Sequence, residues 1–236
     1  LVTLHQRLVA AITQLTDEYE IIFVNDGSID GSWKEIIKLS DNNNLVIGIN
    51  LMKNYGQHNA LLCGIRAAKN EVIVTMDDDL QHSPSDIHVL QQTMENSDYD
   101  VCYALFDKKQ QTFLKNIGSW FNDKVASIVI KKPNEIYLSP YKAIKREVVD
   151  EIVKYNGPYP YIDGLIFRTT QSITQVIVKH HKRYAGKGNY NLSNSISVWL
   201  KLATNFSVFP LRVATYLGFI ASGIGFILSL FFILAI

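Results

Sequence analysis

Short apolar segments that read as strands alternate with helical patterns through the first part of the chain, and this alternation restricts the fold more than any other feature. The segments are rich in Ile, Val, Leu and Tyr, and apolar residues recur at helical spacing between them. Such an alternation predicts an α/β fold in which helices cover a mostly parallel sheet. The predicted strands span 19–25, 45–51, 71–76 and 99–105, and the predicted helices span about 32–40, 57–69 and 84–96.

The chain opens on a helical pattern rather than on a strand. Leu4, Leu8, Ile12 and Leu15 recur at the spacing of one helix face. Because a right-handed crossover needs a strand before its helix, we expect a first strand upstream of Leu1. The later elements are less clearly marked, with predicted helices at about 112–131 and 145–155 and a predicted strand at 173–180.

Composition excludes one large class of partner. The chain has 23 Lys and Arg against 22 Asp and Glu, and its formal net charge is +1. This balance provides no positive field over the surface, so we do not expect nucleic acid as a partner. Cys63 and Cys102 lie among apolar residues and outside any metal-ligand spacing, which favours buried reduced thiols in a cytosolic compartment.

The C-terminal residues form a long apolar segment. Residues 213–236 contain no Asp, Glu, Lys, Arg or His. A helix of this length covers the ~30 Å hydrocarbon core of a bilayer, so we predict a transmembrane helix, with a buried core helix as the alternative. The apolar run reaches Ile236, and we expect the membrane region to continue with further spans.

The stretch before this segment fits a membrane surface. Residues 195–212 mix Trp199 and other apolar residues with Lys201, as an interfacial amphipathic helix does, and Arg212 directly precedes the apolar run. A positive residue on the side of the large domain, residues 1–194, predicts that this domain faces the cytoplasm at the inner (cytoplasmic) membrane.

Three acidic residues in a row follow the third predicted strand, in the stretch TMDDDLQHSP. Side chains alternate along an extended segment, so Asp77 and Asp79 point to one side and Asp78 to the other. Two carboxylates on one side can share a hard divalent cation with diphosphate oxygens, and Gln81 can add a neutral oxygen ligand. The alternative is an acidic loop before a helix that Ser83 caps.

The first predicted strand ends in the stretch VNDGSIDGS. Asp26 and Gly27 are expected to form a tight turn there, and Ser28 or Asp30 can cap the helix that follows. Ligands of open parallel sheets bind outside the carboxyl ends of the strands, so this turn is also a candidate binding loop. On this stretch alone, a plain structural turn is an equal alternative.

Several spaced motifs together point to a family. The stretch NLMKNYGQHNALLCGIRAAKNEVIVTMDDDLQHSP, with EIIFVNDGSIDGSW before it, resembles the family 2 glycosyltransferases of the GT-A fold. Within that family the chain is similar to dolichyl-phosphate mannose synthase and to bacterial undecaprenyl-phosphate sugar transferases, over nearly its whole length. The resemblance implies an inverting, metal-dependent enzyme. It would move a sugar from a nucleotide diphosphate sugar, a UDP-sugar, to a polyprenyl phosphate such as undecaprenyl phosphate.

On the donor side, the resemblance implies roles for residues at three strand ends. Asp26 would contact the nucleoside, and Asn54 and Gly56 would line the donor pocket. The acidic residues would bind the donor diphosphate, with Asp79 as a catalytic residue. The ligands of a Mg²⁺ or Mn²⁺ ion would be Asp77, Asp79 and Gln81, and Asp78 would belong to the nucleotide-sugar site.

On the acceptor side, the stretch HHKRYAGKGNYNL resembles the family pattern His-x-x-Arg-x-x-Gly-x-Ser-x-Tyr, except that Gly188 replaces the serine. Arg183 matches the arginine and suits a phosphate oxygen. Lys115, Ser119 and Lys142 fall where the family binds the acceptor phosphate. For each lysine, a solvated surface charge is an equal alternative.

A general base is not required for this acceptor. A phosphate monoester has a second pKa of about 6 and is largely dianionic at pH 7, so the nucleophile needs no deprotonation. Asp163 is a candidate base or orienting acid, with a helix cap as the alternative. The family's acidic residue before its Phe-Arg pair is missing, because Ser139 and Pro140 precede Tyr141.

Two other functions stay open from the sequence. The enzyme could use another membrane-linked glycan acceptor, or the chain could bind nucleotide sugars at the membrane without turnover. The partners expected are therefore a nucleotide sugar donor, a polyprenyl phosphate acceptor and the lipid bilayer. The sequence leaves a homo-oligomer open.

Overall fold

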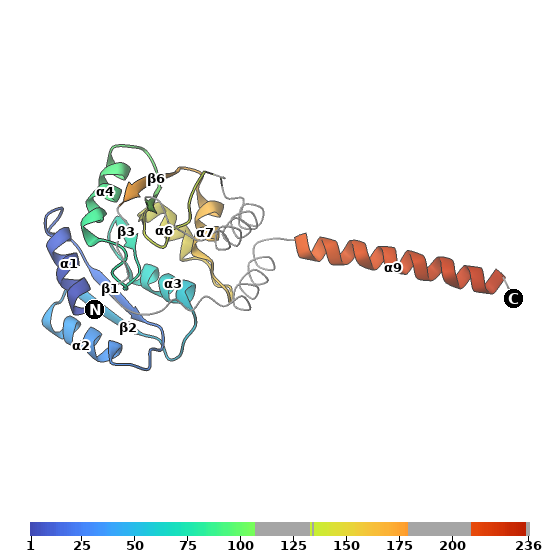
Figure 1. Cartoon of the computed structure of the whole chain (residues 1–236), viewed down its shortest axis with the longest axis horizontal. Coiled ribbons are helices and arrows are strands. Elements are labelled where there is room, and N and C mark those ends of the chain that lie inside the picture. Colours follow the sequence, from blue (N-terminus) through green and yellow to red (C-terminus); the bar gives the residue numbers. More distant parts are fainter. Residues whose placement is uncertain (107–132, 134, 179–208, 235–236) are drawn as a thin grey trace.

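The computed structural model describes residues 1–106, 133, 135–178 and 209–234. These residues form an α/β domain and a long C-terminal helix that extends away from it (Figure 1). The strands of the domain form two sheets, one of two strands and one of four.

The smaller sheet contains the first two strands of the described chain. β1 (Ile21–Asn25) pairs in parallel with β2 (Val46–Asn50) over their whole length. α2 (Ser32–Asn42) makes the crossover between them. Because the two strands run in the same direction, the loops that follow Asn25 and Asn50 leave the sheet at the same edge.

The larger sheet contains β3 (Val72–Thr75), β4 (Val101–Phe106), β5 (Lys142–Lys145) and β6 (Ile173–Val178). Its strand order is β3-β5-β4-β6. β4 pairs in parallel with β6, whereas β5 runs antiparallel to both of its neighbours. β3, β4 and β6 therefore share one direction, as the sequence predicts. β5, which the sequence does not predict, is the one strand of this sheet that runs in the opposite direction, and both of its ladders are antiparallel.

β5 escapes the sequence pattern because it carries little strand signal of its own. It consists of KAIK, with a lysine at each end. Strand propensity depends strongly on neighbours, and this segment becomes a central strand only through its ladders to β3 and β4. α6 (Arg146–Ile152) follows it directly and lies within the helix predicted at about 145–155.

Helices pack on the sheets through the apolar faces that the sequence spacing predicts. On α4 (Ile87–Glu95), for example, Ile87, Leu90 and Met94 are buried at intervals of three and four residues. The other helices of the domain are α1 (Val2–Ile12), α3 (Gln57–Ala67), the 3₁₀ turn η1 (Pro84–Asp86) and α7 (Ile162–Thr169).

The core lies on both faces of the larger sheet. Along β4, Val101 and Tyr103 pack into a cluster with α3, α6 and α7, while Cys102 and Ala104 pack into a second cluster with α1, α2 and α4. Burial raises the pKa of the Cys102 thiol to about 11, which fits the predicted buried reduced cysteine. Cys63 is only partly buried.

α9 (Phe209–Leu234) is the one helix of the described chain that is long and apolar enough to cross a membrane. Its segment Ala214–Leu234 has a mean hydropathy of 2.4, and none of it is buried in the structure. The alternative of a buried core helix is therefore wrong. Pro210 lies in the first turn of α9. Backbone N–H groups in a first turn have no hydrogen-bond partner within the helix, so a proline is tolerated there. Most of the interfacial segment predicted at 195–212 lies outside the described residues.

Candidate active site

The turn after β1 is bound to the loop after β2. The two carboxylate oxygens of Asp26 accept hydrogen bonds from the backbone N–H groups of Tyr55 and Gly56, at 2.7 and 2.8 Å. Two charge-assisted bonds to one carboxylate fix the loop that leads into α3. The structure thus brings together Asp26, Asn54 and Gly56, which the resemblance assigns to the donor pocket.

Gly27 makes this close approach possible. Its φ is +70°, and a Cβ at this position would lie 2.5 Å from the backbone nitrogen of Asn54. A side chain would therefore collide with the neighbouring loop as well as strain the turn.

The expected helix cap at Ser28 or Asp30 is wrong, because Gly31 is the N-cap of α2 and no side chain caps it. Asp30 Oδ1 instead accepts from Ser32 N at 2.9 Å. Hydrogen bonding from the Ser32 side chain, and then from its backbone, lowers the pKa of Asp30.

The acidic segment folds into a compact turn directly after β3. Asp77 and Asp79 are half-buried and Asp78 is exposed. The Asp77 N–H donates to His82 Nδ1 at 3.1 Å, and Asp79 Oδ1 accepts from the Gln81 N–H at 3.0 Å. Backbone hydrogen bonds at both ends hold the carboxylates in place.

Two further details complete this turn. Leu80 has a φ of 62°, which is unusual for a residue with a side chain. Ser83 stands at the N-cap of η1, but its hydroxyl pairs with that of Ser85 at 2.7 Å and makes no capping bond. The expected serine cap is therefore wrong.

The acidic segment offers hard oxygen ligands but not a complete metal site. In the part of the chain that the structure describes, no group of three His, Cys, Asp or Glu could hold an ion alone. Asp77, Asp79 and Gln81 fit a cation that takes its remaining ligands from water or a bound diphosphate. Such oxygen ligands suit Mg²⁺ or Mn²⁺.

His82 supports the acidic turn, although no sequence pattern singles it out. Its ring is 5% exposed and stacks on Phe106 and Tyr141, with centroid distances of 5.3 and 5.2 Å. The Tyr141 hydroxyl donates to the carbonyl of Ser83 at 3.0 Å. The histidine therefore ties Asp77 to an aromatic stack on β4 and next to β5.

Lys142 and Asp163 form a buried ion pair. Lys142 is 2% exposed, and its ammonium binds Asp163 Oδ1. The Tyr103 hydroxyl donates to the same oxygen at 2.8 Å, and the ammonium lies 4.8 Å from the centroid of the Tyr103 ring. Burial and the nearby Asp163 charge raise the pKa of Tyr103 well above its usual value. The alternative of a solvated surface charge is wrong for Lys142.

Asp163 does not cap α7. It lies inside the first turn, and Tyr161 occupies the N-cap without a side-chain capping bond. The carboxylate instead turns toward β4 and β5, where Tyr103 and Lys142 bind it. The helix-cap alternative for Asp163 is therefore wrong.

The first turn of α3 contacts both the acidic turn and the start of α7. Gln57 Nε2 donates to Asp77 Oδ1 at 2.9 Å, one residue after the loop that Asp26 binds. The next residue, His58, accepts at Nδ1 from the Ile162 N–H at 3.4 Å. Burial lowers the pKa of His58, against the Asp163 charge, which raises it. The acidic turn and the start of α7 therefore meet at one short helical segment.

The remaining predicted acceptor residues cannot be placed. Lys115, Ser119 and Arg183 lie outside the described residues, as does the whole HHKRYAGKGNYNL stretch.

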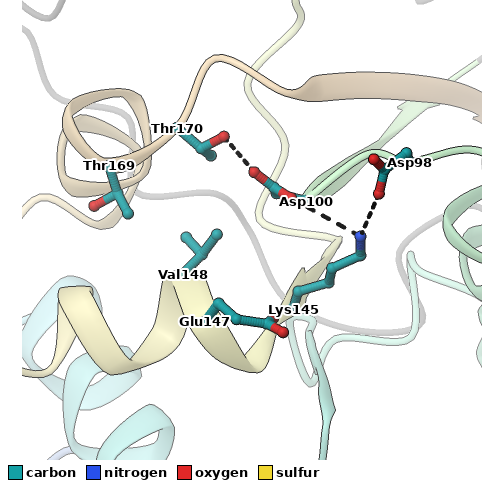
Figure 2. Close-up of a pocket in the computed structure, with 7 residues that line it drawn as sticks. All are labelled: Asp98, Asp100, Lys145, Glu147, Val148, Thr169 and Thr170. Carbon is teal, nitrogen blue, oxygen red and sulfur yellow. Dashed lines mark hydrogen bonds and ion pairs between the residues drawn. The ribbon is translucent and has the colours of Figure 1, made fainter.

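A cavity of about 400 Å³ lies at the opposite edge of the larger sheet, where β4 begins and β5 ends. Figure 2 shows Lys145 reaching toward Asp98 and Asp100 at its mouth. None of the residues that the sequence predicts for the site lines it. The lining residues are Asp98, Asp100, Lys145, Glu147, Val148, Thr169 and Thr170.

The fold is that of an α/β protein, and these groups gather at the carboxyl edge of its strands, the edge at which open α/β sheets bind their ligands. A family model described as Glycosyl transferase family 2 matches residues 2–153. The chain belongs to glycosyltransferase family 2.

Known proteins similar to the chain agree with this family. The chain is 30% identical over 235 residues to the undecaprenyl-phosphate 4-deoxy-4-formamido-L-arabinose transferase of Aeromonas hydrophila, covering 97% of this chain and 70% of the relative. The enzyme of the same description from Photorhabdus laumondii is 30% identical over 229 residues, covering 95% and 69%.

A solved structure agrees with the fold. Glucosyl-3-phosphoglycerate synthase from Mycobacterium tuberculosis, in complex with Mn²⁺, UDP-glucose and phosphoglyceric acid, aligns with a TM-score of 0.56 at 14% identity. The alignment covers 84% of this chain and 71% of the synthase. The predicted GT-A type of α/β fold is thereby confirmed.

Proposed function

We propose that the chain transfers one sugar from a nucleotide diphosphate sugar, a UDP-sugar, to undecaprenyl phosphate at the cytoplasmic face of the inner membrane. The observation that carries the proposal is the run Tyr55–Gly56–Gln57, whose three residues bind both Asp26 and Asp77. This run joins a candidate nucleoside loop to a candidate diphosphate site. The activities of the Aeromonas and Photorhabdus relatives support undecaprenyl phosphate as the acceptor.

Donor binding follows from the groups at the carboxyl edge. Asp26, Asn54 and Gly56 would contact the nucleoside side of the donor, and Asp77, Asp79 and Gln81 would hold a Mg²⁺ or Mn²⁺ ion, with Asp78 exposed beside them. When bound, the ion neutralises charge on the departing diphosphate. The N-terminal end of α3 lies at the same edge, and its dipole favours a negative group there.

The proposed reaction is a single displacement. A phosphate oxygen of the acceptor attacks the anomeric carbon, the bond from that carbon to the diphosphate oxygen breaks, and its electron pair leaves with the nucleotide diphosphate. The configuration at the anomeric carbon inverts. Because the acceptor phosphate is already ionised at pH 7, the enzyme must chiefly position it and neutralise the leaving group.

Membrane attachment fits an acceptor whose phosphate lies at the bilayer surface. α9 would anchor the chain, and the positive residue Arg212 before its apolar segment favours a cytoplasmic domain. Lys115, Ser119 and Arg183 remain the proposed ligands of the acceptor phosphate. A soluble acceptor would not require this attachment.

The test is a transfer assay with the full-length protein in lipid nanodiscs. Undecaprenyl phosphate, Mg²⁺ or Mn²⁺ and a panel of nucleotide sugars are supplied, and free nucleotide and glycosylated lipid are both measured. We expect both products from one donor. Asp79→Asn should lower turnover about 100-fold or more, since it removes charge stabilisation at the leaving group. Asp98→Asn, at the opposite edge, is the matched control and should keep full turnover.

Three outcomes would change the proposal. Transfer to another membrane-linked glycan, with undecaprenyl phosphate ignored, would replace the acceptor. Nucleotide-sugar binding without any product would contradict the reaction itself. Full turnover in Asp79→Asn, or in excess chelator, would contradict the metal role.

A further inference from the structure

A buried polar cluster lies at the carboxyl edge of the larger sheet, and the displacement reaction does not by itself explain it. The cluster consists of Tyr103 on β4, Lys142 on β5 and Asp163 on α7. Lys142 lies opposite Thr75 in the β3–β5 ladder, and Thr75 precedes Asp77 by two positions. The cluster is therefore adjacent to the acidic turn.

Stability alone is a weak reason for such a cluster. The desolvation of two charges offsets most of their attraction, and apolar replacements of a whole buried ion pair are often neutral or stabilising. Tyr103 is 0% exposed and Lys142 is 2% exposed, so both polar groups are fully removed from water. Apolar side chains of similar volume could fill the space of these three residues instead.

The geometry of Asp163 is asymmetric. Both donors, the Tyr103 hydroxyl and the Lys142 ammonium, bind Oδ1. Within the described ranges, no hydrogen bond reaches Oδ2. The Asp163 side chain also keeps 10% of its surface exposed, against 2% for Lys142. One oxygen is thus held by the protein, and the other is left to accept a further hydrogen bond.

We propose that Tyr103 and Lys142 are positioning residues that hold Asp163 by Oδ1, so that Oδ2 accepts a hydrogen bond from a hydroxyl of the transferred sugar. The inference rests on the proposed sugar transfer and names the group that orients the sugar. Lys142 then acts through Asp163 and does not bind the acceptor phosphate, which corrects the role implied by the family resemblance.

The charges around Asp163 favour a sugar hydroxyl over a phosphate as its partner. A carboxylate only accepts hydrogen bonds, and a hydroxyl donates one, whereas an ionised phosphate would be repelled. Lys142 cancels the Asp163 charge, so the pair does not repel the nearby donor diphosphate. The other titratable groups that face Asp163 are His58 on α3 and Tyr161 beside α7, and burial lowers the pKa of His58 and so favours its neutral form.

The first test removes a single hydrogen bond. Tyr103→Phe keeps the aromatic ring beside the Lys142 ammonium but loses the bond to Asp163 Oδ1. We expect turnover to fall about tenfold, because a hydrogen bond to a charged group is lost, while affinity for UDP stays within about twofold.

The second test removes the whole cluster without leaving a buried charge. The triple variant Tyr103→Phe, Lys142→Met, Asp163→Leu should fold and bind UDP like the wild type, and its turnover should fall about 100-fold or more. Lys145→Met is the matched control, because it removes a lysine from the other end of the same strand. It should keep the wild-type rate.

Several outcomes would overturn the inference. They are wild-type turnover in the triple variant, or a Tyr103→Phe variant whose affinity for UDP falls together with its turnover. Absence of wild-type transfer would contradict the proposed function instead.

Discussion

The two lysines of β5 make similar ion pairs at opposite ends of one strand, in different surroundings. Lys142 begins the strand, is 2% exposed, and binds Asp163 deep in the domain. Lys145 ends it with a side chain 29% exposed, and its ammonium lies 3.4 Å from Asp98 and 3.9 Å from Asp100 (Figure 2). One pair lies beside the acidic turn and the other beside an open cavity.

The difference favours the carboxyl edge, rather than the cavity, as the place of the proposed active site. Charges in solvent interact weakly, and each can find water in place of its partner. A buried pair must be satisfied by the protein, so it fixes the groups around it. The carboxyl edge has the bonded turns and the buried charges, whereas the cavity at the other edge is lined by three acidic residues and one lysine.

The largest expected difference between the two lysines is in their contribution to the free energy of unfolding. Lys142→Ala leaves the Asp163 charge buried without its cation, and breaking a buried pair in this way costs about 3 to 5 kcal/mol. We expect that loss in the free energy of unfolding, measured by denaturant titration of the protein in detergent. Lys145→Ala should change the stability little, since solvent replaces its partners. Equal losses in the two variants would remove the distinction between the strand ends.

A second test asks whether the carboxyl edge is tightly packed. Gly27→Ala places a Cβ against the backbone of Asn54 and forces a left-handed φ on alanine, which costs about 1 to 3 kcal/mol. We expect a lower melting temperature and weaker UDP binding, because the Asp26 turn must move. Gly31→Ala is the control, since a Cβ there meets nothing within 4 Å. Unchanged UDP affinity in Gly27→Ala would separate this turn from the donor site.

Much of the fold could be predicted because its signals are local. The alternation of strands and helices follows from apolar spacing in the sequence, and α9 follows from its length and hydropathy. β5 could not be predicted, because KAIK becomes a buried strand only between β3 and β4. The burial of Lys142 is likewise a property of its neighbours rather than of the local sequence.

The candidate site divides in the same way. Asp26, Asp77 and Asp79 could be found because polar residues at the carboxyl ends of strands stand out from the apolar runs before them. His82 and Tyr103 could not, because each is a single residue whose role depends on contacts across the fold. The Tyr103 hydroxyl, for example, binds a carboxylate 60 positions away in the chain. No local pattern encodes such a contact.

The smallest expected effect is a pH dependence at the carboxyl edge. Burial lowers the pKa of His58 in the folded chain below its usual value, while the unfolded chain keeps a histidine pKa of about 6.5. Above that pH neither state takes up a proton. As the pH falls below about 6.5, the unfolded state binds a proton that the folded state resists, so stability is lost on the acid side. His58→Gln should reduce this slope in melting temperatures recorded between pH 7.5 and 5, and Lys145→Met should keep it. An unchanged slope in His58→Gln would mean that the burial of His58 does not cause the loss of stability at acid pH.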